Sequence, residues 1–331
     1  MAHARLGRSV FNAIALAVGL SATGLCADPA SAQDWPSRNI TVIVPLGAGS
    51  ASDIVARVVM EQVAKQVGQS IVVENRPGAG GTIGANAVAK SAPDGYTILA
   101  YGAMASANAL YSKLPYDTLN DFIPVMGLGQ QPLVLVVAPS KGYKTLKDLA
   151  AAGKAKPGSL NYSTAGIGSA SHFGAERLRA SAGFEALNIP FKGASEAVTE
   201  VIAGRADFSM QLITTTLSQV REGTLAALAV SSNQRVSMMP DVPTTIEAGL
   251  PPESVYPFYT ALYLPAKTPQ AIVEKLYTET TKALQEPAVQ AKFKSIGVEP
   301  MPMTRQQFDK FFRDDVAGNA ALVKAANIPV Q

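Results

Sequence analysis

Short apolar runs alternate with longer amphipathic segments along most of this chain. The first unit begins with ITVIV at residues 40–44, passes through PLGAGSAS, and continues with apolar residues at three- and four-residue spacing to Val63. A β-branched run of this length predicts a buried strand, and the wider spacing predicts one face of a helix. This opening unit is therefore predicted to be a strand, a tight turn and a helix that ends at Gly68.

The same alternation recurs towards the C-terminus. Strands are predicted at residues 71–74, 96–101, 160–164, 186–191, 206–211, 225–230 and 256–264, and helices at residues 195–203, 214–221 and 305–326. Alternating strands and helices favour an α/β fold with mostly parallel sheets covered by helices. In such folds, ligands bind beyond the C-terminal ends of the strands.

The apolar stretch at residues 122–137 is interrupted by prolines and glycines. This pattern suits a segment that crosses between two lobes better than one continuous element. A chain of 331 residues also exceeds the usual size of a single hydrophobic core. The predicted organisation is a first lobe that starts with residues 33–131, a second lobe at residues 132–255, and a return to the first lobe at residues 256–331.

An export signal is predicted at residues 1–32. Arg5 and Arg8 precede an uncharged, mostly apolar run at residues 9–25, and Ala30-Ser31-Ala32 supplies the small residues that a signal peptidase requires. No later stretch has the roughly 20 apolar residues that are needed to cross a bilayer. The mature protein is therefore predicted to be soluble and to lie in the periplasm.

Removal of this signal would change the chemistry available to the chain. The single cysteine, Cys26, suggests a lipoprotein as the alternative, although Leu25 before it is bulkier than a lipobox normally permits. Loss of Cys26 and His3 leaves His172 as the only residue of either type, which excludes disulfides, thiol catalysis and Cys/His zinc sites. No metal or cofactor is predicted. The net charge of +3 does not suggest a nucleic-acid partner.

The turn at residues 46–53 is the first candidate binding element. Ser50 and Asp53 have the spacing of a helix N-cap and its reciprocal partner, so the amide groups of the first helical turn would point out of the turn. Such a helix start attracts a carboxylate or a phosphate. Asp53 would alternatively serve only as a capping carboxylate. A tight turn that binds nothing is the alternative for the whole segment, because glycine also relieves ordinary backbone strain.

Two enzymatic interpretations compete with anion binding. Gly47-Ala48-Gly49, followed by Glu74 at the end of the next strand, partly matches a dinucleotide fingerprint. However, Ser52 replaces the third glycine, and an exported protein has no obvious supply of nicotinamide cofactor. His172 with Ser169 or Ser50 suggests a hydrolase, but the chain has no G-x-S-x-G motif.

A second turn, AGIGSASH at residues 165–172, repeats the arrangement of the first. Its serines, like those of the first turn, are neutral donors that bind a carboxylate without the desolvation cost of a buried cation. Lys192-Gly193 would bring a cation to the cleft, although a solvated surface lysine is the commoner case. The two turns predict a cleft in which two helix N-termini face one small anion. The predicted ligand-binding residues are Leu46, Gly47, Ala48, Gly49, Ser50, Asp53, Ser106, Ser163, Thr164, Ala165, Gly168, Ser169, His172, Lys192 and Gly193.

Several long blocks of sequence occur in an order that covers essentially the whole mature chain. They are WPSRNITVIVP from Trp35, NRPGAGGTIGANAVAKSAPDGYTIL from Asn75, LPYDTLNDFIPV from Leu114, STAGIGSASHFGAE from Ser163, IPFKGASEAV from Ile189, PDVPTTIEAG from Pro240 and LPAKTP from Leu264. In these blocks the chain resembles the substrate-binding proteins of tripartite tricarboxylate transporters, the Bug-type extracytoplasmic solute receptors.

The resemblance implies a two-lobed periplasmic binding protein fold, type II-like, that closes on a carboxylate and delivers it to a membrane permease. The two segments that hold the ligand would be Leu46–Asp53 and Ser163–His172. The first turn lacks the usual aromatic residue and Gly-Gly pair, and other aromatic residues replace the usual tryptophan near the return crossing. Aliphatic di- or tricarboxylates and aromatic carboxylates such as terephthalate are therefore both expected. The prediction is a non-catalytic, monomeric receptor with a hinge near Gln131 and Pro257.

Overall fold

Six strands build the sheet of the first lobe in this computed structural model, which describes residues 35–256, 258–325, 328 and 330. The sheet order is β11-β4-β10-β3-β1-β2. The strands are β1 (Ile40–Val44), β2 (Ile71–Asn75), β3 (Thr97–Tyr101), β4 (Phe122–Gln131), β10 (Phe258–Pro265) and β11 (Glu299–Pro300). The predicted signal at residues 1–32 lies outside the described residues.

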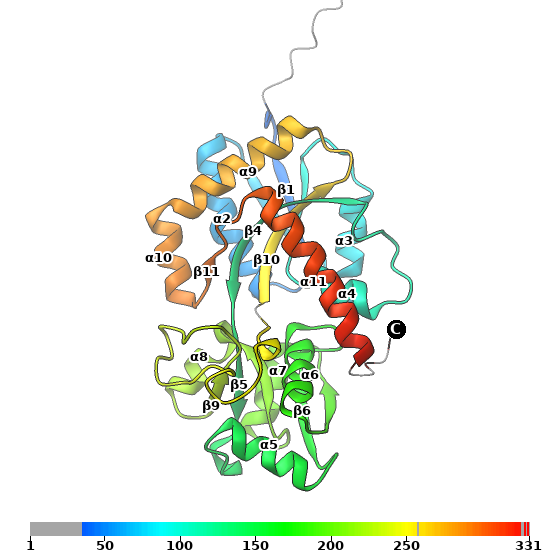
Figure 1. The fold of residues 1–331 in the computed structure, drawn as a ribbon. Helices are drawn as coiled ribbons and strands as arrows, with labels where there is room; N and C mark the ends of the chain where they lie inside the picture. Colours follow the sequence, from blue (N-terminus) through cyan, green and yellow to red (C-terminus); the bar gives the residue numbers. More distant parts are fainter. Residues whose placement is uncertain (1–34, 257, 326–327, 329, 331) are drawn as a thin grey trace, which may run out of the picture. The chain divides into compact units, whose positions relative to one another are not determined.

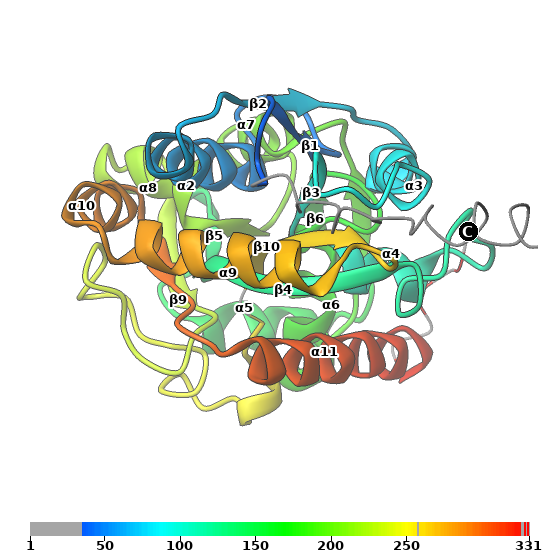
Figure 2. The same ribbon diagram turned by 90° about the horizontal axis from the view of Figure 1, so that it is seen from above.

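Helices cover both faces of this sheet. They are α2 (Ala51–Val67), α3 (Thr82–Ala89), α4 (Met104–Leu110), α9 (Gln270–Gln285), α10 (Pro287–Ile296) and α11 (Arg305–Ala325). Helix α2 packs on α9 and contacts β10, whereas α11 packs on α4 and β4. Figure 2 shows α2 and α11 on opposite sides of β4 and β10. The chain thus buries the central apolar strands of the sheet between two helical layers.

The second lobe contains a three-stranded sheet in the order β8-β5-β9 and a parallel pair, β6-β7. A parallel bridge between Tyr162 and Phe208 connects β6 to the segment that leads into β8. The strands are β5 (Leu133–Val137), β6 (Leu160–Thr164), β7 (Ala186–Pro190), β8 (Ser209–Leu212) and β9 (Ala226–Val230). The helices are α5 (Leu146–Ala155), α6 (Ala170–Ala182), α7 (Ala194–Ile202) and α8 (Ile213–Arg221).

The fold confirms the predicted α/β class, but the sheets are mixed rather than mostly parallel. In the first lobe β1 pairs in parallel with β2 and β3, whereas β10 runs antiparallel to β3 and to β4. In the second lobe β5 runs antiparallel to both neighbours. The reason is topological. Strand β10 re-enters the first sheet from the second lobe, so it runs against the strands that lead towards that lobe.

Residues 122–131 form one ten-residue strand, contrary to the expectation that proline and glycine would break this stretch. Pro124 pairs with Tyr263 beside an irregularity in the register, a position where a missing N–H is tolerated. The glycines instead allow close packing, because a Cβ at Gly129 would lie 2.6 Å from Val298. The chain then passes through Pro132 into β5. Figure 1 shows β5 below β4.

Local signals set most element ends. Gly68 closes α2 with a left-handed φ of 67°, and Thr145 with Asp148 forms a complete capping box at α5. Thr304 and Gln307 exchange the same pair of bonds before α11.

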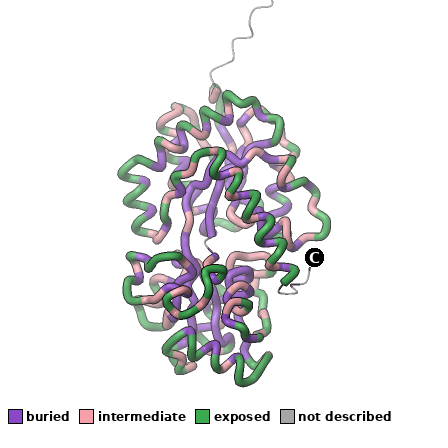
Figure 3. The backbone as a smooth tube through the Cα atoms, in the orientation of Figure 1, coloured by how far each residue is buried: buried purple, intermediate pink, exposed green. Residues whose placement is uncertain are grey.

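Figure 3 shows that buried residues concentrate in the strands, whereas exposed residues recur along the outer helices. No helix within the described ranges combines the length and apolar character required to cross a membrane.

Candidate functional site

The first turn connects β1 to α2, and its geometry depends on Asp53. The Ser50 hydroxyl accepts a hydrogen bond from the Asp53 amide at 3.4 Å, so the predicted N-cap is confirmed. The reciprocal bond, however, comes to Asp53 Oδ2 from the amide of Gly49 at 2.9 Å, because the Ser50 amide donates to the carbonyl of Gly47. The Asp53 carboxylate therefore accepts from Gly49, the residue before the N-cap, whereas in a standard capping box it would accept from the amide of the N-cap residue itself.

The other oxygen of Asp53 is also occupied. Oδ1 accepts from Arg57 Nε and from Asn75 Nδ2, each at 2.9 Å, and Asn75 also donates to the carbonyl of Leu46 at 3.0 Å. Asp53 is only 3% exposed. Burial alone would raise its pKa, but the hydrogen bonds from Arg57, Gly49 and Asn75 outweigh burial and hold the pKa below its ordinary value. Asp53 is therefore an ionised anchor beneath the turn.

The second turn connects β6 to α6 and is anchored by neutral groups. The Ser169 hydroxyl accepts from the His172 amide at 3.3 Å and donates to the carbonyl of Gly166 at 2.6 Å. The Ser171 hydroxyl accepts from the amide of Ala165 at 2.9 Å. Gly168 has a left-handed φ of 85°, a conformation that L side chains rarely adopt.

His172 completes this arrangement. Its Nδ1 accepts from the amide of Gly168 at 3.3 Å, which requires the ring proton to be on Nε2. The ring is 4% exposed, and burial lowers the pKa of His172, an effect that the nearby Glu176 only partly opposes. Glu176 itself accepts a hydrogen bond from Tyr162 and pairs with Arg179 at 2.6 Å. His172 is thus a neutral acceptor that shapes the turn.

Both helix starts leave amide groups available. Among the described residues, the amides of Ala51 and Ser52 at the start of α2 have no acceptor, and the same holds for Ala170 and Ser171 at the start of α6. These are the groups that a helix cannot pair internally. Each turn therefore offers a pair of N–H donors with the partial positive charge of a helix N-terminus.

Helix α4 brings the two lobes together beside the second turn. The Ser106 hydroxyl donates to the carbonyl of Ala103 at 2.9 Å and lies 3.3 Å from the carbonyl of Gly168. A Cβ at Gly168 would lie 3.1 Å from Leu110 Cδ1. Ser106 therefore contacts the second turn directly.

Other predicted residues have different partners. Ser163 is fully buried and donates to the carbonyl of Ala197 in α7 at 2.7 Å, and Thr164 donates to Asn188 in β7 at 3.0 Å. Their hydroxyls join neighbouring elements of the second lobe. Lys192 is exposed. The adjacent Gly193 is the N-cap of α7 and makes no side-chain cap bond.

Sequence reasoning missed the residues that support the turns from a distance. Arg57 and Asn75 anchor Asp53, and Leu110, Phe173 and Tyr256 share one apolar cluster with Ala51 of the first turn. Asn75 opens the NRPGAGG block, which was the available signal. Leu110 and Phe173 gave no signal because their contacts join distant segments, whereas Tyr256 belongs to the aromatic stretch noted near the return crossing. Three cavities of about 280, 350 and 610 Å³ have no residue of either turn in their described lining.

This arrangement matches solved structures, among them the periplasmic binding protein BugD, with a TM-score of 0.80 at 31% identity over 90% of this chain and all of that one. A structure of Rpa4515 from R. palustris with adipate has a TM-score of 0.83 at 28% identity, covering 90% of this chain and all of that one. MatC from Rhodopseudomonas palustris with bound malate has a TM-score of 0.78 at 31% identity, covering 87% of this chain and 99% of that one. The protein therefore has the two-lobed fold of the periplasmic binding proteins.

The family follows from the sequence comparison. Residues 55–328 match the model of the tripartite tricarboxylate transporter family receptor. The protein BugT of Bordetella pertussis (strain Tohama I) is 36% identical over 306 residues, which cover 92% of this chain and 94% of BugT. The chain belongs to this receptor family. Its members and structural neighbours are solute-binding receptors, so the dinucleotide-enzyme and hydrolase alternatives are wrong.

Proposed function

We propose that this protein captures a small carboxylate outside the cytoplasmic membrane and delivers it to the permease of a tripartite tricarboxylate transporter. The observation that carries the proposal is the pair of helix starts at Ala51 and Ala170, whose first amides have no acceptor among the described residues. Each such end stabilises a nearby anion by about 0.3–1 kcal/mol when exposed, and by more when partly buried.

The charges around the two turns favour a carboxylate held by neutral donors. Arg57 is paired with Asp53, so it brings no net cation to the first turn. In the second turn, His172 is held neutral by burial. Amides and hydroxyls bind a carboxylate without the cost of desolvating a full cation. The adipate and malate complexes of the two related proteins support this ligand class.

Closure of two lobes would bring the turns onto one ligand. In the proposal the first lobe comprises residues 33–131 and 256–331, the second lobe comprises residues 132–255, and the hinge lies near Gln131 and Pro257. Gln131 ends β4, and its side-chain oxygen accepts from Thr214 of α8 at 2.8 Å. Pro257 is outside the described residues. The receptor would act as a monomer, exported by the signal at residues 1–32.

A carboxylate panel tests the ligand class. Adipate, malate, citrate and terephthalate would be titrated against the purified protein, with NAD as the control for a dinucleotide ligand. A ligand that binds only the folded state raises the melting temperature with occupancy. At least one carboxylate should raise it at millimolar concentration. A shift with NAD alone, or with no carboxylate, would contradict the proposal.

A glycine substitution tests the site. Gly168→Ala would place a Cβ at a φ of 85° and 3.1 Å from Leu110, so it should hinder closure and raise the carboxylate Kd at least tenfold. Gly142→Ala is the matched control, because Gly142 has a φ of 77° and no atom within 4 Å of its Cβ position. Calorimetry should find the control unchanged. Equal affinities in both variants would remove the second turn from the site.

A further inference from the structure

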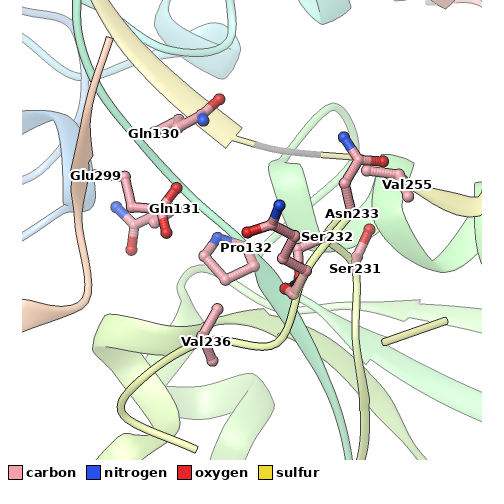
Figure 4. Close-up of a pocket in the computed structure, with 10 residues that line it drawn as sticks. Gln130, Gln131, Pro132, Ser231, Ser232, Asn233, Val236, Val255 and Glu299 are labelled. Atoms are coloured by element: carbon pink, nitrogen blue, oxygen red, sulfur yellow. Dashed lines mark hydrogen bonds between the residues drawn. The ribbon is translucent and has the colours of Figure 1, made fainter. Parts of the chain in front are cut away.

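A cavity of about 280 Å³ opens where the chain passes between the two lobes. The first lobe contributes Gln130, Gln131 and Glu299, and the second lobe contributes residues 231–234, which follow β9. Figure 4 shows Gln131 and Glu299 on one side of Pro132, with Ser231 and Asn233 on the other. A second cavity of about 350 Å³ shares Pro132 and Glu299 with the first. The first of these is called the hinge cavity below.

The hinge cavity lies across the crossing strands from the two turns. In the first lobe the sheet order places β4 and β10 between β11, which carries Glu299, and β1, which leads into the first turn. In the second lobe, β5 has β9 on one side and β8 on the other. Strand β9 leads to Ser231, whereas β6, which is bridged to the segment before β8, leads into the second turn. If the lobes pivot about these crossing strands, closing the turns onto a ligand separates the walls of the hinge cavity.

The lining of the hinge cavity favours a cation. Its described lining residues include one exposed carboxylate, Glu299, and several carboxamides, but no lysine or arginine. Lys294 lines the second cavity, which also reaches Glu299. The neighbouring Arg235 does not neutralise Glu299, because it pairs with Glu247 at 2.9 Å and donates to the carbonyl of Pro240. An unneutralised carboxylate in a concave polar site attracts positive charge, and N–H donors on that charge would pair with the amide oxygens.

The serine hydroxyls of the cavity have partners already. Ser231 bonds to the carbonyl of Ser254 and accepts from the Tyr256 amide, and Ser232 donates to the carbonyl of Gln234 at 2.6 Å. Gln131 is 2% exposed. Its side-chain oxygen is held by Thr214, so its position at the hinge is fixed. The groups that remain for a ligand are the Glu299 carboxylate and the outer carboxamides.

We propose that the hinge cavity binds a small organic cation with several N–H donors, and that this cation favours closure of the lobes. The cavity is present in a structure in which Ser106 touches the second turn, a contact that the proposed closure assigns to the closed arrangement. A molecule that binds one conformation better than the other shifts the population towards it. The cation should therefore strengthen carboxylate binding, a step that rests on the proposed carboxylate function.

The first experiment uses the full protein without any carboxylate. 1,4-Diaminobutane is titrated by calorimetry, with 1,4-butanediol as the uncharged compound of similar shape. The diamine should bind at one site, Glu299→Gln should weaken it at least tenfold, and the diol should not bind. Glu222→Gln is the control, because it removes the same charge from an exposed position on the second lobe and should leave the diamine affinity unchanged. Equal diamine binding in Glu299→Gln, or equal binding of the diol, would overturn the site.

The second experiment tests the coupling. The carboxylate with the largest thermal shift is titrated with and without saturating diamine. Its Kd should fall several-fold in the wild type and stay unchanged in Glu299→Gln. An unchanged Kd in the wild type would overturn the coupling. Because the first experiment contains no carboxylate, its failure leaves the carboxylate proposal standing. Conversely, failure of the carboxylate panel leaves the diamine result valid.

Discussion

The two turns present the same kind of helix start but are anchored by different chemistry. Beneath the first turn, the ionised Asp53 accepts from the Gly49 amide and is held by Arg57 and Asn75. Beneath the second, the neutral ring of His172 accepts from the amide of Gly168. Orienting the turn therefore requires a buried acceptor below it, but not a charged one. The two anchors should respond differently to substitution and to pH.

Removal of the charged anchor should have the largest effect. Asp53→Asn deletes a buried carboxylate and leaves the guanidinium of Arg57 without its partner. Breaking a buried pair costs about 3–5 kcal/mol, but Arg57 is about half exposed and water compensates part of the loss. The free energy of unfolding should therefore fall by about 2–3 kcal/mol in urea denaturation.

The control for this prediction is Asp309→Asn. Asp309 pairs with Arg313 at 2.9 Å, also one helical turn apart, but both side chains are substantially exposed. Exposed pairs of this kind contribute about 0.5 kcal/mol. If the two variants lose the same small amount of stability, Asp53 is not the anchor of the first turn.

Acidification should affect the anchors of the two turns at different pH values. Burial lowers the folded-state pKa of His172 below 6.5, so the unfolded chain binds the proton more readily. The stability contributed by neutral His172 is present above about pH 6.5 and is lost as the pH falls towards the lower folded-state pKa. The pKa of Asp53 is also lowered, but from 3.8, so its contribution persists until the pH falls below that value.

His172→Gln tests this difference, because the glutamine oxygen can accept from the Gly168 amide without titrating between pH 7 and pH 5. The wild type should lose more stability than the variant over this range in urea denaturation. Asp315, whose pKa is raised by burial, has the opposite sign, but it titrates in both proteins and cancels in the comparison. Parallel pH profiles would show that His172 is not a titrating anchor.

The comparison also shows what sequence can predict. The Ser50 N-cap follows from spacing within one turn of helix, because its partner is three residues away. The bond from Asn75 to Asp53 joins residues 22 positions apart, and no local pattern encodes it. Ser163 and Thr164 end their strand at the expected position, yet their hydroxyls bond to α7 and β7. Periodicity fixes alternation along a strand, but not which element covers each face.

Substitution of Ser106 should have the smallest effect, and it tests most specifically how the second turn is held. The second turn contacts α4 of the other lobe through Ser106, whereas Ser52 of the first turn lies 3.4 Å from Thr260 of its own lobe. Ser106→Ala removes one such bond, worth about 1 kcal/mol, so carboxylate affinity should fall about fivefold. In the proposed closure this contact forms as the lobes close, so the loss should appear in the dissociation rate.

Ser295→Ala is the matched control for Ser106→Ala. Ser295 donates to the carbonyl of Lys292 at 2.7 Å, three residues back, just as Ser106 donates to Ala103. Both variants lose this local bond, but only Ser106→Ala also loses the contact with the second turn. Stopped-flow dissociation of a bound carboxylate should therefore accelerate in Ser106→Ala alone. Equal rates in the two variants would mean that Ser106 supports its own helix and that the lobes close without it.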